Sequence, residues 1–266
     1  MSPWVLRGLR DGVVTTAWPG KPDPYADGSR GPATVLRARP QDTTATADLC
    51  PTGAIAENDA GALSLDQGRC ILCGRCVQQR PDVFAWSGGP ASSALARTGL
   101  VVPELTETSA GPAAVRAALA ERTAALRRSV HLRHVDAGSD GSEEQEIAAL
   151  LNPVYDIGRL GIFFTASPRH ADVLLVTGAG THGMAEPLRR TYAGMPDPKI
   201  VIAVGTDAVS GGLLASSYAT SGGVGSIVPV DVWVPGSPPP PFAILHGLLA
   251  GLGRLPARQE AGGERR

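Results

Sequence analysis

The four cysteines of this 266-residue chain are the residues whose types and spacing most clearly suggest chemistry. Cys70, Cys73 and Cys76 stand at C-x-x-C-x-x-C spacing, and Cys50 precedes Pro51 farther upstream. A cysteine triplet in a short loop, completed by a distant Cys-Pro, is typical of the ligands of a 4Fe–4S cluster. The alternatives are a structural zinc site and a disulfide pair, but zinc usually takes two separated C-x-x-C pairs. The spacing therefore predicts one 4Fe–4S cluster on these four thiolates.

Composition narrows the class of protein that could carry such a cluster. The formal net charge is −1, which suggests neither nucleic acid nor an anionic membrane surface as a partner. No apolar run is long enough to span a bilayer, and the N-terminus lacks a hydrophobic signal. Clustered, reduced cysteines fit the cytosol. We therefore expect a soluble or peripheral cytoplasmic protein.

Residues 49–101 surround the cysteines with a small α+β pattern. Apolar segments at Ala54–Ala56 and Ala62–Leu65 bracket a polar turn, which predicts a hairpin. Together with the cysteine spacing, this pattern resembles bacterial-type ferredoxin domains. Two-cluster ferredoxins need four further cysteines, and this chain has other residues at the matching positions: Pro40, Thr43, Thr46 and Arg80. The resemblance therefore implies that one cluster site is complete and that the other was lost as a set.

The segments on either side of this unit are less regular. Residues 1–48 form no clean period, and Trp4–Leu6 and Val13–Thr16 are interpreted as short strands or an extended arm. An isolated arm of this composition would be disordered, so we expect it to dock on the second domain or on a partner subunit. Residues 102–129 are predicted to form a linker helix, and residues 254–266 a flexible tail.

Residues 130–253 are predicted to form an α/β domain with a mainly parallel sheet. Near-continuous apolar runs at 161–165, 172–177 and 199–204 are typical of parallel strands buried on both faces. A further strand is expected at 130–135, and helices at about 143–151, 183–194 and 239–250. Several glycines follow the strand ends, where open parallel sheets bind ligands.

This second half resembles the B-type subunit of respiratory complex I and the small subunit of membrane-bound NiFe hydrogenases. The matching blocks include Arg133–Ser139, Ala166–Asp172, Met184–Tyr192, Ala203–Gly205 and Pro235–Pro239. The first half resembles the ferredoxin-like subunit that lies beside this one in the same complexes. The chain is therefore identified as a fusion of two neighbouring electron-transfer subunits.

The resembled family holds a terminal 4Fe–4S cluster with four cysteines in this domain, and this chain has none of them. The matching positions are Asp140, Glu143, Asp207 and Ser237. Carboxylates and a hydroxyl are poor ligands for an iron–sulfur cluster, so we expect no cluster there. The four side chains could instead converge on a hard cation such as Mg²⁺, Mn²⁺ or Ca²⁺. Alternatively, they cap their own loops, which is the commoner use of Asp and Ser.

The two resemblances imply an electron-transfer subunit with one 4Fe–4S cluster and no catalytic residues of its own. Its partners would be a large hydrogenase-like or complex I-like subunit and a membrane arm, with quinone or ferredoxin as a possible redox partner. The chain would then lie in the cytoplasm, peripheral to the inner face of the cell membrane. The alternative is a structural adaptor or redox-sensing subunit with a broken electron path.

Overall fold

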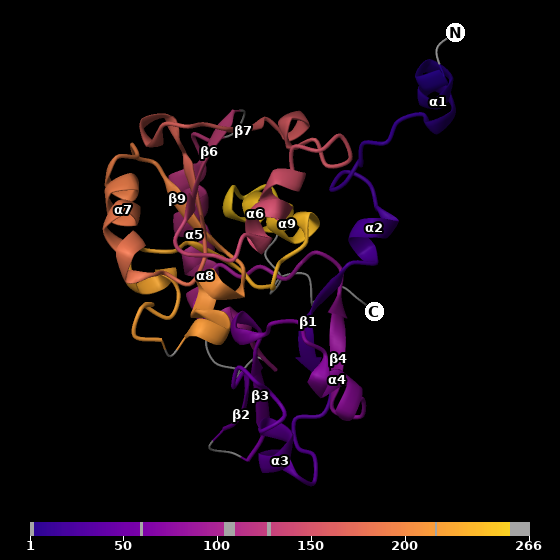
Figure 1. Ribbon diagram of the computed structural model, residues 1–266, viewed down its shortest axis with the longest axis vertical. Coiled ribbons are helices and arrows are strands. Elements are labelled where there is room, and N and C mark those ends of the chain that lie inside the picture. Colours follow the sequence, from indigo (N-terminus) through magenta and orange to yellow (C-terminus); the bar gives the residue numbers. More distant parts are fainter. Residues whose placement is uncertain (1–2, 59–60, 104–109, 127–128, 216, 256–266) are drawn as a thin grey trace.

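The computed structural model describes residues 3–58, 61–103, 110–126, 129–215 and 217–255 (Figure 1). The cysteine-bearing part contains two small antiparallel sheets, and the C-terminal part contains one five-stranded sheet. Among the described residues, no helix is long and apolar enough to cross a membrane.

The five-stranded sheet confirms the predicted α/β domain. Every neighbouring pair of its strands is parallel, in the order β10-β9-β8-β6-β7. The strands are β6 (Val130–Asp136), β7 (Ile162–Phe164), β8 (Val173–Thr177), β9 (Ile200–Val204) and β10 (Val232–Val234). All residues of β8 and β9 are buried, as expected for strands covered on both faces.

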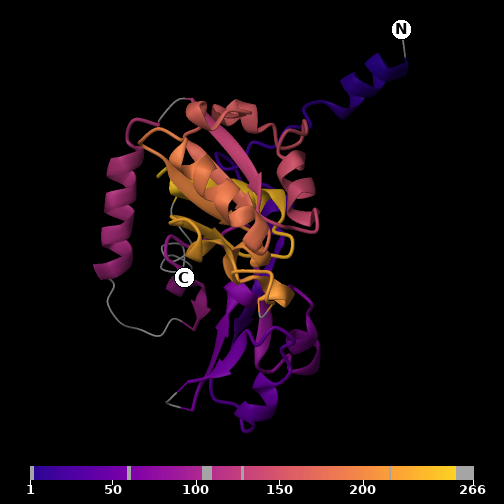
Figure 2. The same cartoon turned by 60° about the vertical axis from the view of Figure 1, so that its left-hand side comes forward.

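Two groups of helices cover the two faces of this sheet (Figures 1 and 2). Ile200, Ile202 and Val204 of β9 belong to one buried cluster with side chains of α5 (Ala110–Thr123), α6 (Ser142–Ala149) and α9 (Pro241–Gly251). Val201 and Ala203 belong to the other, with α7 (His182–Ala193) and α8 (Thr206–Ser210). Every residue of α9 is buried, which explains why its sequence is apolar on all sides.

The cysteine-bearing part includes a strand that lies within the segment assigned to the arm. β1 (Arg30–Val35) pairs antiparallel with β4 (Phe84–Gly88), so residues 30–35 pack with this part. The predicted hairpin is present as β2 (Ile55–Glu57) and β3 (Leu63–Asp66), and β5 (Val101–Val102) pairs with β3. Its short helices are α3 (Thr43–Ala47) and α4 (Arg75–Gln79), and the 3₁₀ turn η1 covers Gln67–Arg69. The helix α2 (Pro24–Asp27) packs with the α/β part instead, since its Ala26 belongs to the same buried cluster as Phe242.

The N-terminal segment differs in part from the sequence prediction. Trp4–Leu6 lies in a helix, α1 (Pro3–Asp11), so the prediction of a strand or extended chain there is wrong. Farther along, the arm docks on the C-terminal part, as expected: the Thr16 amide donates to the Val154 carbonyl at 2.8 Å. The Trp18 ring then packs edge-on against Phe242, with ring centroids 5.6 Å apart.

A segment of the cysteine-bearing part, between β4 and β5, is held against the edge of the large sheet. Ala94 and Trp233 exchange backbone hydrogen bonds of 2.9 and 2.8 Å, which forms an isolated antiparallel bridge beside β10. The adjacent Ser93 hydroxyl and His246 Nδ1 form a buried hydrogen bond of 2.8 Å. The cysteine-bearing part is therefore held in a defined position against the α/β part.

Candidate metal centre

The cysteine triplet lies on a loop whose backbone needs glycine. Leu72 and Gly74 both have left-handed backbone angles, with φ of 58° and 76°, and α4 begins directly afterwards. A Cβ atom on Gly74 would stand 3.0 Å from the Trp86 ring. Gly74 therefore meets two requirements at once, because it takes the positive φ freely and leaves room for Trp86.

The four cysteines line one small cavity beneath this loop. Cys50, Cys70 and Cys76 are half-buried against the apolar core of the cysteine-bearing part, and Cys73 is exposed. All four are free thiols, so no disulfide is present. The Ala54 amide donates a hydrogen bond to Cys50 Sγ at 3.3 Å. The structure thus brings the sequence-predicted ligands together around one space.

Burial makes two of these thiols, those of Cys70 and Cys76, difficult to ionise in the absence of a cation. Desolvation raises the pKa of Cys76 to about 11, and the neighbouring thiols add to this rise through charge repulsion. The pKa of Cys70 is also raised, first by burial, although backbone amides partly offset the effect. Thiolates in such a setting are stabilised by bound metal, because its positive charge offsets both the desolvation and the repulsion between the thiolates.

A zinc site and a 4Fe–4S cluster place different demands on the four cysteines. Within the described ranges, no group of three or more His, Cys, Asp or Glu side chains is placed to hold one metal ion. A tetrahedral zinc site draws four thiolates onto a single ion. A 4Fe–4S cluster binds each thiolate to a different iron atom, so its ligands stand farther apart.

The cysteine loop is joined directly to the α/β part. The Thr206 hydroxyl, at the start of α8, donates to the Cys70 carbonyl at 2.9 Å and accepts from the Gly236 amide at 3.3 Å. On the same side, Arg97 makes two hydrogen bonds to the Asp66 carboxylate, of 2.8 and 2.6 Å. These contacts fix the loop against α8.

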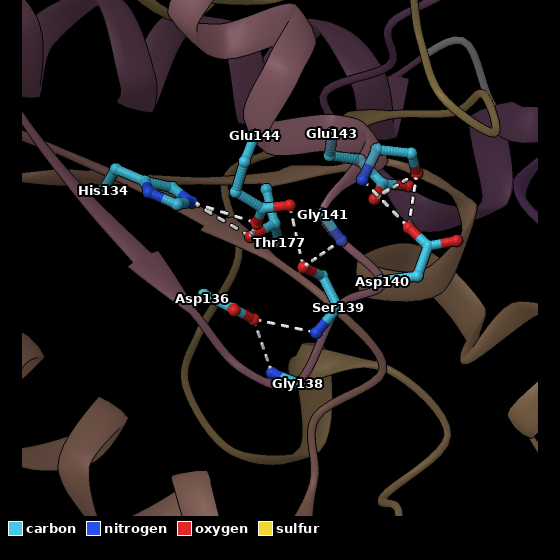
Figure 3. Close-up of polar contacts among 10 residues, drawn as sticks. His134, Asp136, Gly138, Ser139, Asp140, Gly141, Glu143, Glu144 and Thr177 are labelled. Atoms are coloured by element: carbon cyan, nitrogen blue, oxygen red, sulfur yellow. Dashed lines mark hydrogen bonds and ion pairs between the residues drawn. The ribbon is translucent and has the colours of Figure 1, made fainter.

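The positions of the missing second-domain cysteines lie next to this junction. Asp207 is the second residue of α8, and Ser237 follows Gly236, whose backbone pairs with Thr206. Asp140 and Glu143 lie at the start of α6 (Figure 3). Glu143 Oε1 lies beside Gly205, at the start of α8, and the charges of Asp207 and Asp140 both act on the pKa of Glu143.

The converging carboxyls differ in their surroundings. Asp140 is exposed and accepts bonds from the Ser142 hydroxyl at 2.6 Å and the Ser142 amide at 2.9 Å, and these bonds lower its pKa. Glu143 is only 1% exposed, and burial raises its pKa to about 7, with Asp207 and Asp140 contributing. Burial and the Asp140 charge also raise the pKa of Asp207. The acidic side chains in the described part of the chain are not grouped to hold one cation.

A polar network that the sequence analysis did not identify supports the loop carrying Asp140 (Figure 3). The Asp136 carboxylate accepts from the Ser139 amide at 2.8 Å, and the Ser139 hydroxyl donates to Glu144 at 2.7 Å. Glu144 also accepts from the Thr177 hydroxyl, which lies 2.9 Å from Nε2 of His134. In the sequence, the only indication of this network was the presence of polar residues at the ends of the apolar runs 130–136 and 173–177.

This network lies at the carboxyl ends of β6 and β8, which are neighbours in the sheet although β7 separates them in sequence. Such a reversal in strand order is where open parallel sheets bind ligands. Here the side chains bond one another and hold the turn at Gly138 and Gly141. Burial lowers the pKa of His134 despite the nearby Glu144, which favours the neutral imidazole. The network therefore positions the loop before α6.

A family model matches most of the α/β part, and a known protein matches a larger portion of the chain. Residues 141–251 match the family described as NADH ubiquinone oxidoreductase, 20 Kd subunit. Formate hydrogenlyase subunit 7 of Escherichia coli is 42% identical over 165 residues, which are 62% of this chain and 63% of that protein. The chain thus spans less than two thirds of this relative.

Two archaeal relatives are covered more completely. The probable membrane-bound hydrogenase subunit mbhJ of Pyrococcus furiosus is 45% identical over 130 residues, 49% of this chain and 78% of that protein. A chain in the solved structure of an archaeal membrane-bound sulfane sulfur reductase aligns with 30% identity and a TM-score of 0.44, covering 53% of this chain and 76% of that one. By its identity to mbhJ and the matching family model, this chain belongs to the NADH ubiquinone oxidoreductase 20 Kd subunit family.

Proposed function

We propose that this chain is an electron-transfer subunit of a membrane-associated complex of the hydrogenase or complex I type. The observation that carries the proposal is the convergence of all four cysteines on one cavity. The relatives support the type of complex, since they are named as subunits of formate hydrogenlyase and of a membrane-bound hydrogenase. The part around the cysteines would be a ferredoxin-like unit fused to the family domain.

In this proposal Cys50, Cys70, Cys73 and Cys76 hold one 4Fe–4S cluster, which supplies one-electron transfer when bound. The chain's own residues shape that site. The Ala54 amide points at Cys50 Sγ and would stabilise a thiolate there. The Trp86 ring lines the cavity.

The contacts around the site suggest where partners would approach. Cys73 is the most exposed of the four cysteines, so a redox partner such as a ferredoxin or a quinone-binding subunit would come nearest on this side. Cys70 is bonded to Thr206, so the opposite side faces the α/β part. The large subunit and the membrane arm would be separate chains.

Metal analysis and spectroscopy test this assignment. The anaerobically purified protein should contain about four iron and four sulfide ions per chain, and dithionite should produce one cubane EPR signal. Cys73→Ser should remove that signal. Asp207→Ala is the matched control and should leave the signal intact, because Asp207 stands at one of the missing cysteine positions of the α/β part and is not a proposed ligand. Zinc in place of iron, or two clusters, would contradict the ligand assignment.

A structural adaptor is the second candidate, and the carboxyls at the missing cysteine positions favour it. Asp140, Glu143 and Asp207 offer no thiolate, so an electron path through the α/β part would stop at the Thr206 junction. The two functions can be distinguished by assaying the chain in a complex with its native large subunit. An electron carrier should reduce a quinone analogue at a rate that depends on Cys73, whereas an adaptor should assemble equally well and support no such reduction.

A further inference from the structure

Helix α1 carries a large apolar surface that the described residues of the chain do not cover. Trp4, Leu6 and Leu9 are 75%, 53% and 73% exposed, and no residue of the helix is buried. The two views show α1 standing apart from both parts of the molecule (Figures 1 and 2). Side chains of this size are normally buried, and an uncovered group of them marks an interaction site.

The helix separates apolar and charged residues onto opposite sides. With about 100° between successive residues, Trp4, Val5, Leu6 and Leu9 fall on one side, and a second, narrower side carries the charges. The charged residues are Arg7, Arg10 and Asp11. Val13 and Val14, 90% and 56% exposed, extend the apolar side beyond the helix. We call Trp4, Val5, Leu6, Leu9, Val13 and Val14 the N-terminal apolar surface.

The chain fixes the position of this surface. Gly12 has a φ of 65°, which redirects the backbone at the end of α1. The chain is then held on the α/β part, where the Thr15 hydroxyl donates to the Pro153 carbonyl at 2.7 Å. The following residue, Thr16, adds the backbone bond to Val154. The helix is therefore presented outward from a short tether.

The chemistry of α1 fits a lipid surface. Tryptophan prefers the interface between headgroups and acyl chains, and leucine and valine insert below it. Arg7 and Arg10 would reach lipid phosphates from the charged side, as basic residues of interfacial helices do. The overall charge of −1 gives no sign of this attraction, because it averages over the whole chain. Locally, Arg7 pairs with Asp11 at 3.5 Å, and Arg10 leaves the helix with a net charge of +1.

A second copy of the chain is a poorer match to this surface. A nine-residue helix is only about 14 Å long, so a pair of such helices buries much less than the ~1,200 Å² of a stable dimer. A bilayer surface takes up all the apolar side chains at once without needing a matching groove.

We propose that α1 lies in the headgroup region of an anionic membrane and fixes the α/β part, on which its tether is held, beside that membrane. This inference deepens the proposed membrane association and rests on it. It does not depend on the cluster, because none of the residues involved contacts the cysteines.

Co-sedimentation of the full chain with lipid vesicles tests the proposal. Vesicles of phosphatidylcholine containing about one third phosphatidylglycerol should bind the protein, and pure phosphatidylcholine vesicles should bind it several-fold less. Leu9→Glu should weaken binding by about tenfold or more. Leu151→Glu is the matched control, since Leu151 is 63% exposed on the α/β part and should not matter. Equal binding by wild type and Leu9→Glu, or none by wild type, would overturn the proposal.

Two further measurements separate the possible outcomes. Vesicles should shift the tryptophan emission of the wild type to shorter wavelength, and Trp4→Phe should abolish the shift while the other tryptophans remain. If Leu9→Glu instead releases the chain from its large subunit and vesicles never bind, α1 docks on protein and the membrane proposal is wrong. Iron content reports separately on the proposed function: Leu9→Glu should keep it, and Cys73→Ser should lose it while still binding vesicles.

Discussion

Glu143 should make the stability of this protein depend on pH in a direction opposite to that of most carboxylates. Its side chain is 1% exposed at the start of α6, beside Asp207 and Asp140. Glu143 Oε2 lies 3.1 Å from the Ser142 hydroxyl oxygen, whose proton is engaged by Asp140 at 2.6 Å. Replacing Glu143 by Gln keeps the shape and an accepting oxygen and removes the possibility of ionisation. The substitution therefore isolates the effect of the buried charge.

The magnitude follows from the shift in the pKa of Glu143, from its ordinary 4.5 to about 7. In this range the folded protein retains a proton that the unfolded chain has released. The free energy of unfolding therefore falls as the pH rises from about 4.5 to about 7 and is then constant. A shift of this size corresponds to about 3 kcal/mol. Glu143→Gln should thus match the wild type near pH 4 and exceed its stability by up to about 3 kcal/mol near pH 8.

Urea unfolding of both proteins at the two pH values measures this difference, because contributions from all other groups cancel in the comparison. Asp140→Asn provides the control of opposite sign. Hydrogen bonds from Ser142 lower the pKa of Asp140, so its ionised form is stabilising and the variant should lose stability toward neutral pH. If Glu143→Gln were less stable than the wild type near pH 8, or if the difference did not change with pH, the reasoning about the buried charge would be refuted.

Two other substitutions test the contacts around the same junction. Gly205→Ala should destabilise the protein by about 2–4 kcal/mol in thermal unfolding, because its φ is 94° and a Cβ would lie 2.4 Å from Glu143 Oε1. Gly183→Ala, with open space around the position, should cost nothing, and equal losses at the two glycines would contradict the argument. Arg97→Ala should cost about 1–3 kcal/mol by leaving the partly buried Asp66 carboxylate without its two-bond partner. Arg97→Lys should restore only part of this loss, since lysine lacks the planar guanidinium group that makes two parallel hydrogen bonds. Full recovery of stability by Arg97→Lys would argue that the two-bond geometry with Asp66 is unimportant.

The parallel sheet could be predicted because its signal is local. Val173–Thr177 and Ile200–Val204 are covered on both faces, and that burial requires uninterrupted apolar residues in each strand. The cysteine spacing is a local signal of the same kind. A short loop has to place Cys70, Cys73 and Cys76 around one space, so the constraint is visible in sequence separation alone.

Contacts between distant segments could not be predicted in this way. β1 pairs with β4 across about fifty residues, and no period within 30–35 indicates that partner. Thr177 meets Glu144 because β6 and β8 are neighbours, which depends on the order of all five strands. Trp4–Leu6 was misread for another reason. Three apolar residues fit a strand or a helix equally well, and neither burial nor a partner strand within the described chain decides between them.

The polar residues at the missing cysteine positions show what contacts add to a sequence comparison. Sequence alone treated Asp140 and Glu143 as equivalent replacements, either as ligands of a cation or as loop caps. The Asp140 carboxylate is exposed and bonded to Ser142, which is the behaviour of a cap. Capping does not account for Glu143, because a buried carboxyl with a raised pKa destabilises the fold when it ionises. The two positions therefore require separate explanations. Toward neutral pH, removing the charge of Glu143 should raise the free energy of unfolding, whereas removing the charge of Asp140 should lower it.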